Sequence, residues 1–271
     1  MQKIAEGTYN KIFLLTLDND RKVIARIPTT LAGPAHLVTS SEVATMDYVR
    51  GLGTPSPRVL AWCSHADDTP VNSEYIIMER VDGVELGRVW DTLEPATKDG
   101  VIREWVAIEK SLTRPIFSGY GSIYYRQDID SRISRELLTG TTCEKRFVIG
   151  PTVERTVWDA ERRDMDIDRG ACKFNPIHRA LPSPTNGSTQ GQMHCHSCKR
   201  PRERRWIEQY AIAGLKTGPF DPPKHLQEPS AHLALPDRFE AVAPYLIPSD
   251  PTLARPILLH NDLHFWKHLR L

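Results

Sequence analysis

The most reactive arrangement of side chains in the sequence lies near its end, in residues 258–264 (LLHNDLH). There an apolar, strand-like run presents Asp262 between two histidines. Asp262 could act as a general base toward a substrate hydroxyl group, with His260 bracing the loop. Two histidines and a carboxylate also suit several metals, and an ordinary polar surface loop has the same residue types. The motif alone leaves these three interpretations open.

A basic residue in the middle of an apolar run is a second candidate. Arg26 lies within residues 23–27 (VIARI), and a charge among apolar neighbours needs a partner if it is buried. Glu42, on the helix expected next, could orient Arg26 toward nucleotide phosphates, as a Lys–Glu pair does in protein kinases. Alternatively, Arg26 faces solvent and Glu42 only closes a capping box with Thr39. The residues support both interpretations equally.

Two further segments could contact a nucleotide. In residues 6–10 (EGTYN), Gly7 lets the backbone approach phosphate oxygens closely, and Thr8 and Asn10 could donate hydrogen bonds. Residues 73–83 (SEYIIMERVDG) are an apolar run that ends in a turn, where backbone groups could face an adenine ring. Each pattern is also typical of an ordinary turn or of a core strand.

Elements that could position these residues follow from the periodicity of apolar side chains. β-prone runs predict five short strands, at residues 11–17, 21–27, 58–63, 74–81 and 119–125. Helical spacing and a capping-box pattern predict four helices, at residues 39–52, 95–114, 202–214 and 237–246. The second helix should bury one face, formed by Ile102, Trp105, Ile108 and Leu112. The initial order of strand, strand, helix, strand, strand suits a small antiparallel sheet that carries one helix.

Seven segments, taken in chain order, carry a resemblance to a known family. They are AEGTYN (5–10), VIARIP (23–28), SEVATM (41–46), SEYIIME (73–79), GSIYY (121–125), DIDRG (166–170) and LHNDLH (259–264). The sequence resembles the fungal branch of the aminoglycoside phosphotransferase-like (phosphotransferase enzyme) family over residues 4–178 and 202–264. This resemblance implies an α+β, protein-kinase-like two-lobe fold, with a small antiparallel-sheet N-lobe and a mostly helical, truncated C-lobe. The expected nucleotide-binding N-lobe spans residues 1–82, and the partial C-lobe spans residues 83–271.

The resemblance also implies a reaction, phosphoryl transfer from ATP to the hydroxyl group of an unidentified small molecule, with Mg²⁺ as cofactor. Gly7 and Thr8 would lie over the ATP phosphates, and the residues from Glu79 to Val81 would form the hinge beside adenine. Arg26 would hold the phosphates, with Glu42 as its partner on the helix. Asp262 would be the catalytic base, and His260 would share its loop.

The end of the chain departs from the family pattern. The family has a magnesium-binding Asn five positions after the catalytic Asp, and Lys267 occupies that position here. An ammonium group repels a cation and cannot bind it. The family's second magnesium-binding Asp is also not found before Leu271. The resemblance therefore predicts a truncated phosphotransferase with poor or absent turnover; the alternative is a non-catalytic, pseudokinase-like nucleotide-binding protein or a partial gene product.

Two segments do not fit the family. Residues 180–201 have almost no apolar periodicity and many helix-breaking residues, which predicts a disordered insertion. Residues 265–271 resemble foreign sequence from a frameshift or an unspliced intron. The insertion contains Cys195 and Cys198, but the chain has no second pair at a suitable distance, so we assign no zinc site and no complete metal site.

Composition excludes several classes of protein. The 271 residues include 35 basic and 34 acidic side chains, so charge does not favour a nucleic acid or a membrane surface as partner. No apolar run is long enough to span a bilayer. Five scattered cysteines argue against a disulfide framework and favour the cytoplasm, with a mitochondrial location open if an N-terminal segment is missing. The acceptor and the oligomeric state are unassigned.

Overall fold

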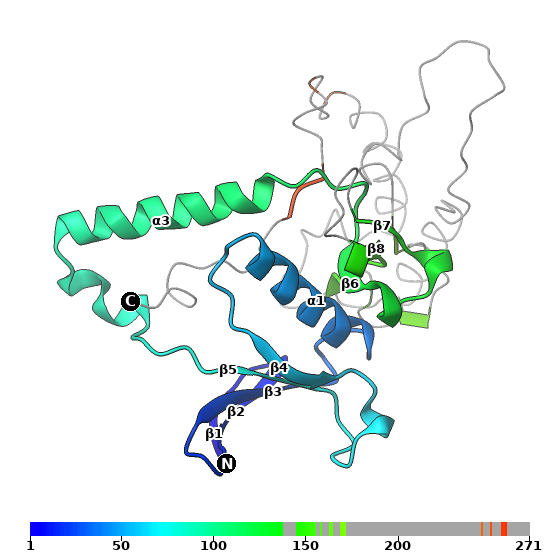
Figure 1. The fold of residues 1–271 in the computed structure, drawn as a ribbon, viewed down its shortest axis with the longest axis horizontal. Coiled ribbons are helices and arrows are strands. Elements are labelled where there is room, and N and C mark those ends of the chain that lie inside the picture. The colour runs from blue at the N-terminus through cyan, green and yellow to red at the C-terminus, as the bar shows by residue number, and fades with distance from the viewer. Residues whose placement is uncertain are drawn as a thin grey trace, which may run out of the picture.

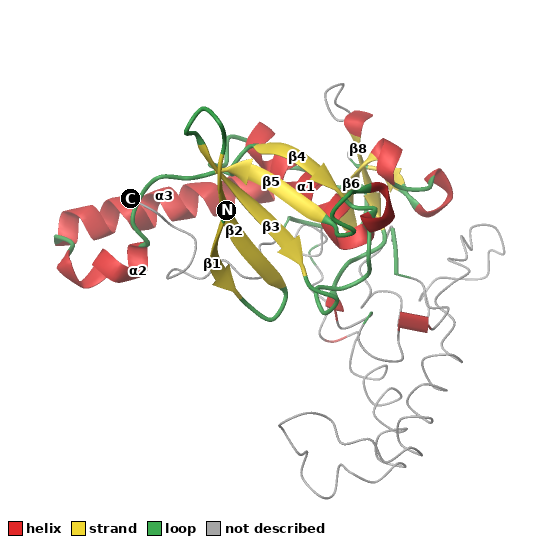
Figure 2. Ribbon diagram, turned by 90° about the horizontal axis from the view of Figure 1, so that it is seen from below, coloured by secondary structure: helices red, strands yellow, loops and turns green. Residues whose placement is uncertain are grey.

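The computed structural model describes residues 1–137, 145–155, 158, 163–164, 169–171, 245, 250 and 256–258. Within these residues the chain forms two antiparallel sheets and three α-helices (Figures 1 and 2). The strands are β1 (Gln2–Glu6), β2 (Asn10–Thr16), β3 (Lys22–Pro28), β4 (Val59–Cys63), β5 (Tyr75–Glu79), β6 (Ser122–Tyr125), β7 (Arg135–Glu136) and β8 (Phe147–Gly150). The helices are α1 (Leu37–Gly51), α2 (Leu86–Val89) and α3 (Pro95–Thr113), with 3-10 turns at Ala66–Asp68, Trp90–Thr92, Arg126–Asp128 and Ser131–Ile133. This mixed fold with an antiparallel N-terminal sheet confirms the predicted fold class.

The first sheet has the strand order β1-β2-β3-β5-β4, and every neighbouring pair is antiparallel. The hairpin turn between β2 and β3 forms where it was predicted, because Asp20 accepts a φ of 60° and Leu17 N donates to Arg21 O over 2.8 Å. The four strands predicted in this part of the chain are all confirmed. We did not predict β1, and its burial pattern gives the reason: all five residues are exposed, so it has no apolar alternation.

The second sheet is smaller and more deeply buried, with the strand order β6-β8-β7. All four residues of β8 are buried. Its apolar face packs on α1 through a cluster of buried residues: Ala44, Tyr48, Phe117, Ile123, Leu137, Phe147 and Ile149. Figure 1 shows α1 between this sheet and the five-stranded one. Helix α1 therefore lies between the two sheets and contacts both.

The start of α1 corrects one prediction. The helix begins at Leu37, with His36 as its N-cap residue at a φ of 64°, and no side chain caps it. Thr39 already lies inside the helix and is buried, while Ser40 Oγ donates to His36 O over 2.7 Å. The capping box predicted between Thr39 and Glu42 is therefore wrong, because the helix begins before Thr39.

The long helix α3 confirms the helix predicted at residues 95–114 but corrects its predicted buried face. It occupies the predicted residues, but Ile102 on the expected buried face is 47% exposed, while Leu112 is 7% exposed. Figure 1 shows the reason, since most of α3 extends away from the two sheets and its last turns approach them. Within the described residues, every helix is too short or too polar to cross a lipid bilayer.

Several predictions concern parts of the chain outside the described residues. These are the insertion at residues 180–201, the helices at 202–214 and 237–246, and the segment 265–271. The domain boundary between residues 82 and 83 also stays a prediction, although the five-stranded sheet ends before it, at Glu79.

Candidate functional site

The centre of the candidate site is an ion pair between a strand and a helix. Arg26 lies in β3, and its Nη1 contacts Oε1 of Glu42 in the second turn of α1. The side chains of Arg26 and Glu42 are 27% and 24% exposed. Burial lowers the pKa of Arg26 to about 10, which still leaves the guanidinium charged at neutral pH. Both alternative interpretations, a solvent-facing Arg26 and a capping Glu42, are therefore wrong.

Apolar side chains accompany Arg26 on its face of the sheet. Arg26 pairs with Ile12 of β2 and with Ile76 of β5, and Ile24 pairs with Met78. Residues directly opposite each other in an antiparallel pair point to the same side, so these side chains share one face. Ile12, Ile24 and Met78 are only half-buried. The face therefore presents an accessible apolar surface beside a fixed positive charge, which suits a flat ring that carries phosphates.

The loop that contains Gly7 and Thr8 connects β1 to β2. It closes with a hydrogen bond of 2.9 Å from Gly7 N to Asn10 O. Thr29, just after β3, holds the loop by two further bonds of 2.8 Å, from its Oγ1 to Thr8 O and from its N to Tyr9 O. A Cβ atom added at Gly7 would meet nothing within 4 Å, so packing does not require glycine here. The open space leaves room for a ligand to approach the backbone.

An arginine that we did not predict contacts the same loop. The guanidinium of Arg155, in the segment after β8, lies 4.0 Å from the ring centroid of Tyr9. A cation over an aromatic face is attracted by the ring. The segment that follows the second sheet thus contacts the loop of the first sheet. Nothing in the local sequence marks Arg155, which lies in a stretch without strand or helix periodicity.

The predicted hinge residues Glu79 and Val81 lie at the end of β5 and beyond it. Both carboxylate oxygens of Glu79 accept bonds of 3.1 Å from Arg58, one from its backbone N and one from its Nε. These contacts lower the pKa of Glu79, the backbone bond most strongly. The Glu79 side chain therefore braces the strand ends, and its backbone N also donates to Arg58 O over 2.9 Å. Val81 is 42% exposed.

His36 joins three distant segments at the start of α1. Its backbone N donates to Glu74 Oε1 over 2.9 Å, its Nδ1 lies 2.8 Å from Ser64 Oγ, and its Nε2 lies 2.9 Å from Asp128 O. These contacts fix the start of α1, where His36 lies six residues before Glu42. His36 is a positioning residue that sequence reasoning missed, because its partners are 28, 38 and 92 residues away along the chain.

Comparison with known proteins supports the resemblance. Residues 1–130 match the phosphotransferase enzyme family. A subtelomeric hrmA-associated cluster protein of Aspergillus fumigatus is 35% identical over 274 residues, covering 96% of this chain and 52% of that protein. The "Altered inheritance of mitochondria protein 9, mitochondrial" of Candida tropicalis is 33% identical over 165 residues, covering 56% of this chain and 26% of that protein. The chain spans about half the length of the Aspergillus relative.

The residues predicted to perform the phosphotransferase chemistry are not among those described. Asp262, His260 and Lys267 all lie beyond residue 258. In the described part of the chain, no three His, Cys, Asp or Glu side chains are grouped so that they could hold a metal ion. The structure brings together Arg26 and Glu42, and it places Gly7 and Thr8 in a loop tied to the end of β3.

Proposed function

We propose that the chain binds ATP on the Arg26 face of the five-stranded sheet and is a kinase-type phosphotransferase for a small-molecule hydroxyl. The observation that carries this proposal is the Arg26–Glu42 ion pair between β3 and α1. A charged arginine with a fixed orientation can hold phosphate oxygens without losing its carboxylate partner, because a guanidinium has five N–H donors. The match of residues 1–130 to the phosphotransferase enzyme family supports the same reaction class.

The described residues fit ATP on three points. Arg26 supplies a positive charge, Gly7 leaves the loop backbone approachable, and Ile24 and Met78 offer an apolar surface to adenine. The backbone from Glu79 to Val81 would bind the adenine edge at the hinge. Bound ATP supplies the phosphoryl group, and Mg²⁺ neutralises its charge. In this assignment Asp262 orients the acceptor hydroxyl as general base, and His260 holds the loop.

One residue favours a second candidate function, which is nucleotide binding without turnover. Lys267 replaces the amide that would bind Mg²⁺ five positions after Asp262. A positive charge there disfavours a second cation nearby. A protein with an intact Arg26 face and a defective metal site would bind ATP and transfer its phosphate slowly or not at all.

Two measurements on the full chain separate these candidates. Titration calorimetry with ATP should detect binding, and Arg26→Gln should weaken it about tenfold or more. Arg103→Gln is the matched control, because Arg103 also pairs with a carboxylate but lies exposed on α3. An affinity that rises with Mg²⁺, together with turnover on a panel of hydroxyl compounds that Asp262→Ala abolishes, supports the enzyme. Binding that ignores Mg²⁺, without turnover, supports the non-catalytic candidate; no ATP binding at all contradicts both.

The compartment is a further proposal. The few scattered cysteines favour a reducing environment, and we propose the cytoplasm. The Candida relative carries "mitochondrial" in its name, so a mitochondrial location is the alternative. Imaging of a carboxyl-terminal fluorescent fusion of the full gene product, with a mitochondrial marker, distinguishes the two compartments.

A further inference from the structure

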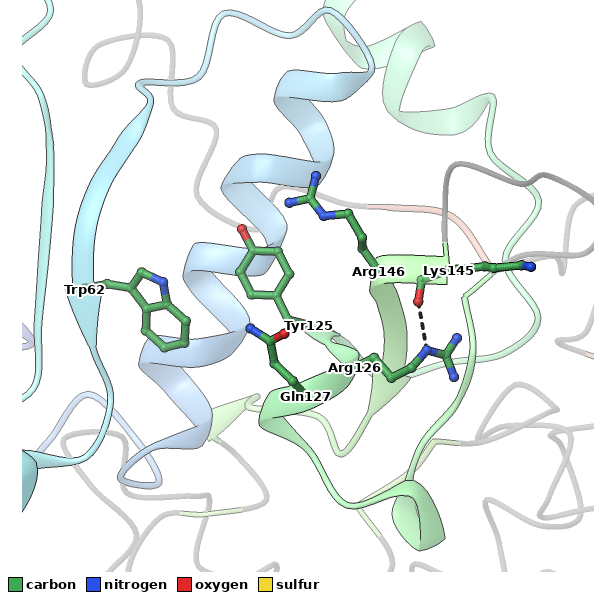
Figure 3. A pocket seen from close by; sticks show the side chains of 6 residues that line it. All are labelled: Trp62, Tyr125, Arg126, Gln127, Lys145 and Arg146. Atoms are coloured by element: carbon green, nitrogen blue, oxygen red, sulfur yellow. Dashed lines mark hydrogen bonds between the residues drawn. The ribbon is translucent and has the colours of Figure 1, made fainter.

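A cavity of about 660 Å³ lies beside α1 (Figure 3). It is lined by residues of β4, of the end of β6 and the turn after it, and of the segment just before β8: Trp62, Tyr125, Arg126, Gln127, Lys145 and Arg146. Its volume is within the range of small-molecule sites. The lining has three cationic side chains and no carboxylate, although Arg126 and Arg146 pair with Glu136 and Asp47 beside it.

The lining residues Tyr125 and Arg146 and the Arg26 side chain contact different sides of α1. The two lining residues contact Asp47, which follows Glu42 by five residues on the helix. At 3.6 residues per turn, five residues correspond to a rotation of roughly 140° around the helix axis. Glu42 and Asp47 therefore point to different sides of the helix, whereas Trp62 and Arg26 both pair with Ile76 and share one face of the sheet.

Arg146 is the cation best placed to bind a ligand. Its Nη2 contacts Oδ2 of Asp47, and its guanidinium carbon lies 5.6 Å from the ring centroid of Tyr125 and 5.2 Å from that of Phe147. These contacts hold the group in place, while 64% of the side chain stays exposed. The remaining N–H donors are available to a carboxylate or phosphate.

The other two cations have different roles. Arg126 makes a bidentate pair with Glu136, over 2.8 and 2.6 Å, and its Nε donates to Lys145 O over 2.7 Å. It therefore braces the cavity wall, and its charge is already compensated. Figure 3 shows the Lys145 side chain directed away from Trp62, so Lys145 adds positive potential rather than a direct contact.

Aromatic rings form the apolar part of the cavity. The ring centroids of Trp62 and Tyr125 are 6.2 Å apart, with an angle of 30° between the planes. Tyr125 stacks on Phe147 on the other side and donates its hydroxyl to Asp47 Oδ2 over 2.8 Å, so its orientation is fixed. The rings are too close together for another ring to enter between them, but their open edges and the outer face of Trp62 can contact a flat ligand.

We propose that this cavity binds a small, planar aromatic compound that carries a phosphate or a carboxylate. The anionic group accepts hydrogen bonds from Arg146, and the ring of the ligand packs on Trp62 and Tyr125. Neither part alone is sufficient, because the cavity is open to solvent on one side and each contact by itself is weak. This proposal does not rest on the proposed ATP site.

The test is titration calorimetry of the full chain with phenyl phosphate and benzoate, with inorganic phosphate and phenol as single-feature probes. We expect an aromatic anion to bind at millimolar concentration or better, and both single-feature probes to bind more weakly. Arg146→Gln should weaken binding about tenfold or more, and Trp62→Leu about fivefold. The matched control Arg103→Gln should leave it unchanged. The preferred anion shows whether a phosphate or a carboxylate is the better partner.

Other outcomes overturn the proposal. They are no binding of either aromatic anion, binding that Arg146→Gln and Trp62→Leu both leave unchanged, and binding that ATP displaces or Arg26→Gln abolishes. Thermal melting of each variant checks that it is folded. If Arg146→Gln melts early because Asp47 loses a partner, Trp62→Leu alone decides the result, since Trp62 has no role in that ion pair.

Discussion

The two sheets contact α1 in different ways. The small sheet packs on it through buried rings, with Tyr48 of α1 lying 5.4 Å from Phe147 and 6.0 Å from Phe117 between centroids. On the side of the five-stranded sheet, α1 forms the Arg26–Glu42 ion pair, whose side chains are 27% and 24% exposed. Close-packed aromatic contacts tolerate little change, whereas a polar pair with access to water can exchange partners. We infer that α1 is fixed to the small sheet and presents Glu42 to the more adaptable Arg26 face of the five-stranded sheet.

The largest effect is expected in the packed contact. Phe147→Ala removes a ring that is 6% exposed, and it should lower the free energy of unfolding by about 3–5 kcal/mol. Ile102→Ala on α3 is the control, because Ile102 is 47% exposed and its truncation should cost less than about 0.5 kcal/mol. Urea denaturation measures both. Equal effects for the two variants would show that the ring cluster does not fix α1.

Two glycine substitutions compare the tightly packed position of Gly121, beside the small sheet, with the open loop at Gly7. Gly121 has a φ of +155°, and an added Cβ atom would lie 2.1 Å from Gly150 O, so Gly121→Ala should cost about 2 kcal/mol or more. Gly7→Ala meets open space and should change the unfolding free energy by less than about 0.5 kcal/mol. If the proposed function holds, it should weaken ATP binding instead, because the methyl group fills open space through which phosphate oxygens would approach the loop backbone. A large loss of stability in Gly7→Ala would show that Gly7, like Gly121, is required for packing.

The ion pair should contribute an intermediate amount. Glu42→Gln leaves the Arg26 charge without its partner in a site where only 27% of that side chain is exposed. We expect a loss of about 1–2 kcal/mol, less than for a fully buried pair because water reaches both groups. Asp99→Asn removes the partner of Arg103 in an exposed pair of α3 and should cost less than about 0.5 kcal/mol. Thermal unfolding of the two variants at one pH compares them.

The smallest effect depends on pH and concerns Asp128, whose backbone O contacts Nε2 of His36. Asp128 Oδ2 is buried and has no hydrogen-bond partner in the described part of the chain. Burial raises the pKa of Asp128, although His36 and His65 partly oppose this shift. Because the folded-state pKa is raised, the charged carboxylate destabilises the fold above that pKa, and the penalty disappears as pH falls through it.

Asp128→Asn should therefore raise the unfolding free energy by about 1 kcal/mol at neutral pH. The gain should shrink toward pH 4, where the wild-type carboxyl group also becomes neutral. Urea denaturation at several pH values measures the difference between the two proteins. A difference that is constant with pH, or larger in acid, would show that the charge of Asp128 is not the cause.

Sequence periodicity predicted the elements of the first sheet better than those of the second. β2, β3, β4 and β5 have enough β-prone residues and turn signals to be recognised. Strand β7 has two residues, and the four residues of β8 are all buried, so neither shows an alternating pattern. Strand β1 failed for the opposite reason, since it is exposed throughout.

The candidate site was only partly predictable for a similar reason. Arg26 and Glu42 were identified, but the sequence could not decide between an ion pair and a capping box. That choice depends on where α1 begins, and the start is set by contacts of His36 with Ser64 and Asp128, far away in the chain. Arg155 over Tyr9 is likewise a contact between distant segments that no local pattern indicates.

A double-mutant cycle on ATP affinity tests the central claim most directly. Calorimetry compares the wild-type chain with Arg26→Gln, Glu42→Gln and the double variant. If Glu42 acts by orienting Arg26 toward phosphate, Arg26→Gln should lose about tenfold or more in affinity, and adding Glu42→Gln should cost little further. Unchanged affinity in Arg26→Gln, or losses that simply add, would contradict the claim that this pair holds the nucleotide.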